Sequence, residues 1–181
     1  MAQWTIDPAH SEIKFKVKHL VISTVTGQFT KFSGTVDAEN ADFSDARIQF
    51  EADVDSITTN NAQRDGHLKS PDFFDASNHP RITFTSKSVA RTSDGEYTVI
   101  GDMTIRGEKR PLTLQVTYNG TVSGFDGEVA AFEISGKLNR QEFGLRWNAM
   151  TEAGGVVVSD EVKLEIVAEL KKVVVEEAVA A

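Results

Sequence analysis

The residues best suited to chemistry in this sequence lie in one polar segment near the middle of the chain. Arg64, Asp65 and His67 are almost adjacent, and Asp72 and Asp75 follow them closely. A histidine oriented by a carboxylate can act as a general base or acid, and an arginine can hold an anionic group. The same side chains can instead be structural, with Arg64 and Asp65 bonded to neighbouring loops and His67 in a polar niche. The sequence alone leaves both interpretations open.

Other patterns typical of catalysis or metal binding are not found in the sequence. It contains no cysteine, which excludes disulfides, thiolate zinc sites and cysteine nucleophiles. It also lacks a Gly-x-Ser-x-Gly motif, which would present a serine nucleophile. The histidines are too far apart for a His-x3-His pair or a zinc finger; they are His10, His19, His67 and His79. We therefore expect no metal site and no cofactor.

The charge balance of the chain is acidic. Lys and Arg total 19 against 27 Asp and Glu, which gives a formal net charge of −8 at pH 7. Binding to a nucleic-acid backbone, or electrostatic docking on anionic lipid, relies on clustered basic residues, so this balance argues against both. A local exception is the alternating series Lys14, Lys16 and Lys18. We interpret it as the solvated face of a strand, which discourages pairing between sheet edges.

Length and composition indicate one domain. The chain has 181 residues, 40% of them hydrophobic, with no linker and no change in composition along it. We predict a single domain over residues 1–172 and a C-terminal tail over residues 173–181. No apolar stretch approaches the roughly 18 to 20 residues of a membrane-spanning helix, so no integral membrane segment is expected. The N-terminus shows no basic segment followed by an apolar run, and the expected location is cytoplasmic.

The dominant hydrophobic period is two, which is typical of strands with one buried and one solvated face. Ile13, Phe15 and Val17, for example, alternate with lysines. The same alternation predicts eight antiparallel strands, at residues 13–19, 29–36, 48–54, 82–89, 97–105, 112–118, 130–138 and 162–170. Turn signals separate them at Thr26-Gly27, Ser93-Asp94-Gly95, Arg106-Gly107 and Asn119-Gly120, the last being a strong hairpin dipeptide.

Two segments interrupt the strands and predict one or two short helices. Between residues 57 and 75, Thr58 or Thr59 can cap a helix, and Ser70-Pro71 is a second capping signal. At residues 139–144 the sequence Asn-Arg-Gln-Glu-Phe-Gly is typical of a single capped helical turn. Both segments lie between strands, where they can cover the ends of a barrel.

The predicted fold class is therefore all-β, an extended antiparallel eight-stranded barrel with one or two short helices. Such a barrel can be packed solid or can hold one small ligand. Eleven phenylalanines, against two tryptophans and two tyrosines, favour an interior that is bulky but has few hydrogen-bonding groups. The residues expected to face inward and line a pore are Phe15, Val17, His19, Ile48, Phe50, Phe84, Val99, Met103, Leu114, Val116, Phe132, Ile134, Leu164 and Ile166.

Six ordered sequence blocks resemble the YceI-like, polyisoprenoid-binding protein family, and they span essentially residues 4–170. The blocks are Trp4-x-Ile6-Asp7-x-x-His10-Ser11-x-Ile13-x-Phe15-x-Val17-x-His19, Gly27-x-Phe29-x-x-Phe32-x-Gly34, Arg64-Asp65-x-His67-Leu68-x-Ser70-x-Asp72-Phe73-Phe74-Asp75, Pro80-x-Ile82-x-Phe84-x-Ser86, Tyr97-x-Val99-x-Gly101-x-Met103-Thr104-Ile105-x-Gly107 and Asn139-Arg140-x-x-Phe143-Gly144. The resemblance implies a lipocalin-like barrel whose elongated apolar pore holds an isoprenoid or another long-chain amphiphile. It also implies a homodimer. Many members carry a secretion signal, which is not seen at this N-terminus, and the family offers no agreed catalytic residues to transfer.

Three functional hypotheses follow from the residues and the resemblance together. We favour non-enzymatic binding, transport or storage of an isoprenoid or other long-chain amphiphile, with Arg64, Asp65 and His67 as candidates for contact with its polar head group. An alternative is an enzyme that acts on an apolar substrate through His67 and Asp65. A third is a solid-cored, stress-related interaction domain whose barrel holds nothing.

Overall fold

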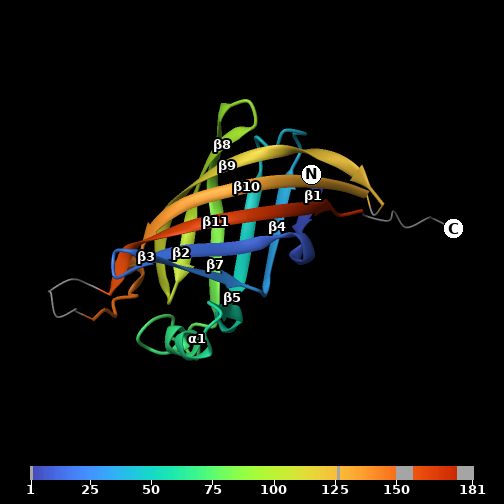
Figure 1. Cartoon of the computed structure of the whole chain (residues 1–181). Helices are drawn as coiled ribbons and strands as arrows, with labels where there is room; N and C mark the ends of the chain where they lie inside the picture. The colour runs from blue at the N-terminus through green and yellow to red at the C-terminus, as the bar shows by residue number, and fades with distance from the viewer. Residues whose placement is uncertain (1, 126, 150–156, 175–181) are drawn as a thin grey trace.

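The computed structural model describes residues 2–125, 127–149 and 157–174. Antiparallel strands dominate this part of the chain, and it contains one α-helix, α1 (Ala62–Lys69) (Figure 1). The strands are β1 (Ala2–Ile6), β2 (Glu12–His19), β3 (Ser23–Phe29), β4 (Phe32–Ala38), β5 (Arg47–Asp53), β6 (Ile57–Thr58), β7 (Arg81–Ser93), β8 (Glu96–Ile105), β9 (Glu108–Gly124), β10 (Gly127–Asn139) and β11 (Val158–Lys172). Short 3-10 helices are η1 (Pro8–His10), η2 (Val54–Ser56) and η3 (Arg140–Phe143).

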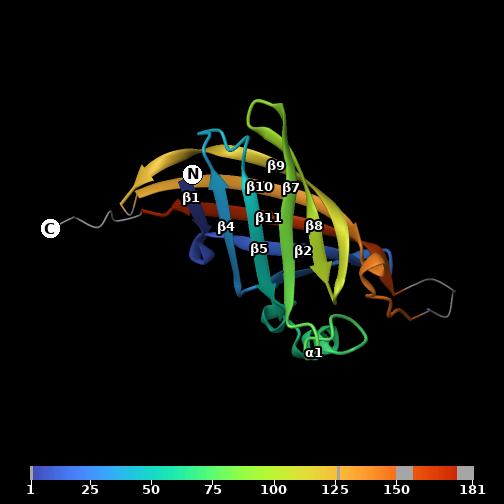
Figure 2. The ribbon, with the colours of Figure 1, turned by 180° about the vertical axis from the view of Figure 1, so that it is seen from behind.

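The sheet closes on itself because β1 pairs with both β4 and β11. Trp4 of β1 lies opposite Val36 on one side and opposite Lys172 on the other. The ring therefore runs β1-β4-β5-β7-β8-β9-β10-β11 and returns to β1. It is a closed eight-stranded antiparallel barrel, which confirms the predicted fold class. In Figures 1 and 2 the layer of β2, β9, β10 and β11 crosses the layer of β4, β5 and β7, so the barrel is built from two facing layers.

Three of the eight barrel strands are each broken in two. β1 and β2 both pair with β11, since Ile6 lies opposite Leu170 and Ile13 lies opposite Ile166, with η1 between them. β3 and β4 pair with β2 and β1 in the same way, and β5 and β6 form the next strand. The predicted run 29–36 thus crosses a break between β3 and β4. The break between β5 and β6, at η2, lies close to α1, whereas the break between β1 and β2, at η1, lies beside β4 and away from α1 (Figure 1).

Two of the predicted turns are wrong. Gly27 lies inside β3 opposite Phe15, and the chain reverses earlier, between His19 and Ser23. Asn119-Gly120 lies inside β9, where the register with β10 shifts by one residue, so Asn119 is an extra residue in the ladder. A bulge of this kind needs a residue that accepts positive φ, and Gly120 has φ of 122°. The hairpin dipeptide therefore bends a long strand and does not end it.

The helix prediction is confirmed for α1 and η3, with one change of cap. The N-cap of α1 is Asn61, whose side-chain oxygen accepts a hydrogen bond from the backbone N–H of Arg64 at 3.0 Å. It replaces the predicted Thr58 or Thr59. Ser70-Pro71 begins no second helix: Ser70 is the C-cap of α1 and is followed by turns. Asn139 caps η3 as predicted, by accepting from the backbone N–H of Gln141.

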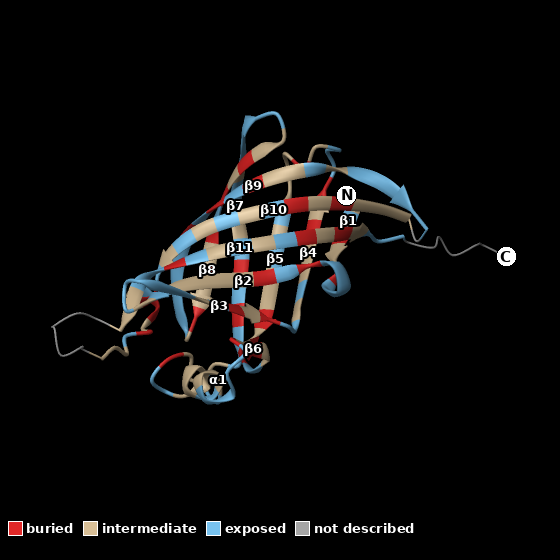
Figure 3. Ribbon diagram, in the orientation of Figure 1, coloured by how far each residue is buried: buried red, intermediate tan, exposed pale blue. Residues whose placement is uncertain are grey.

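Burial alternates along the barrel strands, as the period of two predicts. In β8, for example, Tyr97, Val99 and Met103 are buried while their neighbours are more exposed (Figure 3). Within the described ranges, no helix is both long enough and apolar enough to span a membrane. The predicted tail over residues 173–181 lies mostly outside the described residues, because these end at Val174.

Candidate functional site

The barrel is hollow. It encloses an elongated cavity of about 450 Å³, and every residue predicted to line a pore contributes to the cavity wall. Apolar side chains from β2, β3, β5, β7, β8, β9, β10 and β11 make up most of this wall. The volume falls within the range of about 300–1,000 Å³ that is usual for small-molecule sites. The open space in the barrel interior does not fit the solid core of the third hypothesis.

The exposure of the inward-facing residues shows where this open space lies. Phe84 and Val99 are 4% and 2% exposed, as expected of side chains packed in a core. Phe15, Phe50 and Ile134 also point inward, but they are only half-buried. They pack against the core on one side and line the cavity on the other. The wall therefore has a packed part and a part that a ligand could cover.

An aromatic cluster closes one end of the cavity. The ring of Phe43 lies 5.1 Å from that of Trp4 and 5.0 Å from that of Phe132, and the Tyr118 and Phe132 rings are 5.1 Å apart. The hydroxyl of Tyr97 donates to a backbone carbonyl in the β4–β5 loop beside this cluster. Burial raises the pKa of Tyr97 above its usual value, so the hydroxyl remains a donor at ordinary pH. This end is sealed by packing.

The opposite end of the cavity is the mouth. There the lining residues are half-buried or exposed, and they come from the β2–β3 hairpin, α1 and the segments that follow η3. They are Lys18, His19, Val25, His67, Trp147, Val157 and Val158. Polar and aromatic groups therefore meet at the mouth, while the interior stays apolar.

Arg64 and Asp65 hold the entry to α1 through Thr59. The Thr59 hydroxyl donates to Asp65 Oδ1 at 2.6 Å, and the Thr59 backbone N–H donates to the same oxygen at 2.8 Å. Arg64 donates from Nε to the Thr59 hydroxyl at 2.7 Å and from Nη2 to its carbonyl at 2.8 Å. Arg64 lines the cavity, whereas Asp65 does not. The contacts of Asp65 therefore support a structural role, in which its carboxylate binds the neighbouring loop at Thr59.

His67 lies at the rim of the mouth. Its Nε2 is 2.9 Å from Asp72 Oδ2, so its carboxylate partner is Asp72 and not the predicted Asp65. Its ring packs edge-on against Trp147 and Phe73, with ring centroids 4.7 Å and 5.0 Å apart. The imidazole is therefore fixed on one side by a carboxylate and on the other by two aromatic rings.

Arg140 ties the rim of the mouth together, a role that could not be predicted from its residue type. The residue is 2% exposed. Its Nε donates to the Ser159 carbonyl at 2.9 Å, and its Nη1 donates to the carbonyls of Leu145 and Trp147 at 2.6 Å and 2.8 Å. Burial lowers the pKa of Arg140. Its place in the Asn139-Arg140 block was visible in the sequence, but the carbonyls it would bind were not.

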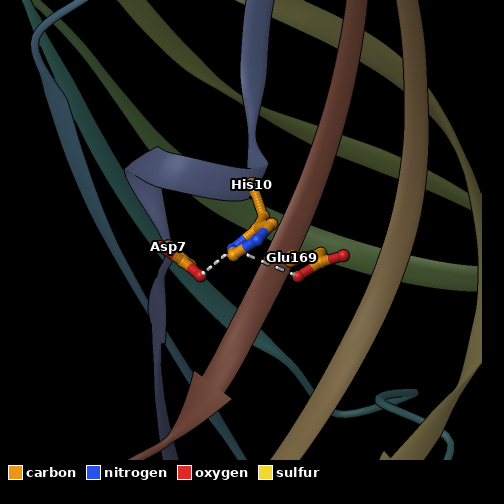
Figure 4. Close-up of side chains that lie close together, drawn as sticks. All are labelled: Asp7, His10 and Glu169. Atoms are coloured by element: carbon orange, nitrogen blue, oxygen red, sulfur yellow. Dashed lines mark hydrogen bonds and ion pairs between the residues drawn. The ribbon is translucent and has the colours of Figure 1, made fainter.

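A second polar cluster lies where β1 ends, apart from the cavity. His10 Nδ1 is 2.7 Å from Asp7 Oδ2 and 3.9 Å from Glu169 Oε2 (Figure 4). The three groups are close enough together to ligate a metal. The Asp7 carboxylate, however, already accepts from the Ala9 backbone N–H and lies 3.5 Å from the Lys171 ammonium. These contacts satisfy the carboxylate without a metal.

The hollow barrel with one sealed end and one polar mouth defines the class of protein, a lipocalin-like β-barrel with an internal cavity. Its sequence matches the YceI-like domain over residues 4–170, and the chain belongs to this family. A UPF0312 protein of Staphylococcus aureus strain USA300 is 39% identical over 171 residues, which are 93% of this chain and 97% of the relative.

Solved structures show the same fold. BcnA of Burkholderia cenocepacia superposes with a TM-score of 0.79 at 24% identity, over 91% of this chain and 98% of that one. A polyisoprenoid-binding domain from Saccharophagus degradans has a TM-score of 0.68 at 16% identity, over 93% and 98% of the two chains. At these identities the likeness establishes the fold.

Proposed function

We propose that this protein binds an isoprenoid or another long-chain amphiphile inside its barrel, without catalysing a reaction on it. The observation that carries the proposal is the apolar cavity of about 450 Å³ that runs from the aromatic cluster at Phe43 to the mouth at His67. The fold supports the proposal, because a domain of S. degradans with the same fold is a polyisoprenoid-binding domain. We infer the class of ligand for this chain from the apolar lining of its own cavity, and not from that neighbour.

The apolar wall of the cavity supports an apolar occupant. A bound chain removes this wall and its own surface from water, which is favourable. Burying each methylene of a ligand contributes about 0.8 kcal/mol before the costs of association. An alkyl or isoprenoid chain is therefore the chemistry that best complements this interior.

The polar head group of the ligand would lie at the mouth. Arg64 and His67 line that end and are the head-group contacts that we propose. Two guanidinium nitrogens of Arg64 bond Thr59, which leaves its remaining nitrogen to approach a ligand oxygen. Asp65 is not proposed as a contact, because its carboxylate bonds Thr59. Transport or storage of the ligand, a homodimer and a cytoplasmic location stay predictions.

The proposal is tested by uptake of a fluorescent isoprenoid analogue by purified protein. Ile134→Arg places a cation on the cavity wall of β10, whereas Glu133→Arg places the same side chain on the outer face of the same strand. We expect Ile134→Arg to abolish uptake and Glu133→Arg to leave it unchanged. Because Ile134→Arg can also unfold the barrel, circular dichroism must first show that both variants are folded. Equal uptake by the folded variants would contradict the proposal.

The pairing of His67 with Asp72 at the mouth is the observation that favours an enzyme instead. An imidazole held by a carboxylate can transfer protons beside a bound substrate. If the protein were an enzyme, His67→Ala would abolish conversion of a bound ligand while leaving its uptake intact. We expect the ligand to be recovered unchanged from both the wild type and His67→Ala.

A further inference from the structure

The tip of the β2–β3 hairpin exposes three consecutive apolar side chains. Leu20, Val21 and Ile22 are 40%, 73% and 87% exposed. Three large aliphatic side chains side by side on one protrusion form an apolar patch of a kind that often marks an interaction site. The fold does not require them for its core, because none of them belongs to the buried cluster or lines the cavity.

The backbone of the tip makes these residue types more unusual. Leu20 and Val21 have φ of 53° and 66°, a conformation that favours glycine or asparagine and that a β-branched residue rarely adopts. The tip is nevertheless held in place, since the Leu20 N–H donates to the Val157 carbonyl at 2.9 Å. The Ser23 hydroxyl donates to the His19 carbonyl at 3.1 Å. A hairpin of polar turn residues would close more easily, so the apolar residues serve something other than the turn.

The hairpin is also basic, in a chain whose net charge is −8. From residue 13 to residue 36 the sequence contains Lys14, Lys16, Lys18 and Lys31 but no aspartate or glutamate. Lys14 and Lys16 pair with carboxylates from outside this segment, at 3.0 Å each, in exposed contacts. Lys18, which is closest to the tip, bonds the Thr24 hydroxyl, and within the described ranges it has no ion-pair partner. The hairpin segment is thus positively charged, although the chain as a whole is negatively charged.

The hairpin lies at the mouth of the cavity. His19 and Val25, just before and just after the tip, line the cavity, and so does Val157, which bonds Leu20. In Figure 1 the hairpin is at the opposite end of the front layer from the β9–β10 hairpin. The register agrees, because His19 pairs with Val158 at the start of β11, whereas Val129 pairs with Lys171 near its end. An apolar tip, basic side chains and the entrance to an apolar cavity are therefore adjacent.

We propose that the β2–β3 hairpin docks this protein on the surface of an anionic lipid bilayer, with the mouth of the barrel facing the membrane. Leu20, Val21 and Ile22 enter the region between head groups and acyl chains, and Lys18 beside the tip meets the anionic head groups. An apolar ligand can then pass between bilayer and cavity with little contact with water. This step rests on the proposed function, since it assumes that the cavity takes up a lipid.

The test is flotation of the purified full-length chain with vesicles of phosphatidylcholine alone or with added phosphatidylglycerol. We expect binding to the anionic vesicles that weakens as salt is added, because each lysine near an anionic surface contributes about fivefold to the affinity. The triple variant L20S/V21S/I22S is expected to bind at least about tenfold more weakly. The matched control V122S/F125S removes exposed apolar side chains from the β9–β10 hairpin and is expected to bind like the wild type.

A second variant separates docking from stability. L20N/V21G supplies the residues that the backbone of the tip favours, so its melting temperature should equal or exceed that of the wild type while vesicle binding is lost. Uptake of a soluble isoprenoid analogue without vesicles should be unchanged in both tip variants. Vesicle binding that is equal in wild type and L20S/V21S/I22S, or equal on neutral and anionic vesicles, would overturn the docking proposal. A wild-type protein that takes up no soluble isoprenoid analogue would instead contradict the proposed function.

Discussion

Gly27 of β3 lies opposite Phe15 of β2, and the ring of Phe15 occupies the space that a side chain at position 27 would need. A Cβ atom at Gly27 would come within 2.2 Å of Phe15 Cζ. The close approach explains why a glycine stands inside a strand, where it otherwise weakens the ladder. It also sets the width of the cavity at this point, since Phe15 is part of the wall.

Gly27→Ala should therefore narrow the cavity. The added methyl group drives the Phe15 ring inward, so we expect uptake of a branched isoprenoid to fall more than uptake of a straight alkyl chain. The overpacking should lower the free energy of unfolding by roughly 1–3 kcal/mol. The control is Gly66→Ala in α1, where a Cβ meets no atom within 4 Å. That variant should keep wild-type ligand preference and gain about 0.5–1 kcal/mol from better helix propensity. Equal effects of Gly27→Ala on both ligands would show that this wall does not select ligand shape.

Part of this structure could be predicted from the sequence, because strand alternation is a local property. The eight predicted strand runs, which leave out β1, and the cap at Asn139 follow from neighbouring residue types. Gly27 and Asn119-Gly120 have the residue types of turns, but they lie inside strands for reasons that involve other strands: the ring of Phe15 on β2 and a register shift against β10. Whether the barrel is hollow could not be predicted at all. Phe15 and Phe84 have the same alternating pattern, yet one faces open space and the other packs.

Arg140 is predicted to support the mouth. Removing its guanidinium leaves several carbonyls in the rim without donors, so Arg140→Ala should lower the free energy of unfolding by roughly 3–5 kcal/mol. Arg140→Lys should restore little of this, because one ammonium cannot reach all the acceptors of a planar guanidinium. Arg47→Ala, at an exposed position of β5, should change stability by less than about 0.5 kcal/mol. Chemical denaturation measures all three, and a lysine variant as stable as the wild type would contradict this role.

The two tryptophans report the orientation of the ligand. Trp147 lies at the mouth, whereas Trp4 packs in the aromatic cluster at the sealed end. A fatty acid that carries a nitroxide beside its carboxyl group should therefore quench Trp147 fluorescence and affect Trp4 little. We expect the quenching to persist in Trp4→Phe and to disappear in Trp147→Phe. Quenching that survives only in Trp147→Phe would mean that the head group lies at the sealed end.

The His10–Asp7 pair predicts how stability varies with pH. The bond to Asp7 raises the pKa of His10 above 6.5, and the bond to His10 lowers the pKa of Asp7 below 3.8. The Asp7 contribution is complete above pH 3.8 and is lost as pH falls through the lowered pKa. The His10 contribution is complete below pH 6.5 and is lost as pH rises through the raised pKa.

The pair should therefore stabilise the fold most between about pH 4 and pH 6.5. Melting temperatures of wild type and His10→Gln, measured from pH 3 to pH 9, should differ most within this window and converge at its alkaline side. His79→Gln is a suitable control, since the same substitution is made there at a histidine outside the pair. A difference between wild type and His10→Gln that grows above pH 8 would have the wrong sign for this pair.

Native mass spectrometry can show whether the cavity between Phe43 and His67 holds an apolar chain. The protein is purified from its own host without detergent, its mass is measured intact, and the released molecules are extracted and identified. We expect one isoprenoid or long-chain lipid per barrel, with its mass lost on denaturation. Protein that is empty, and that also takes up neither isoprenoids nor fatty acyl chains when these are added, would contradict it.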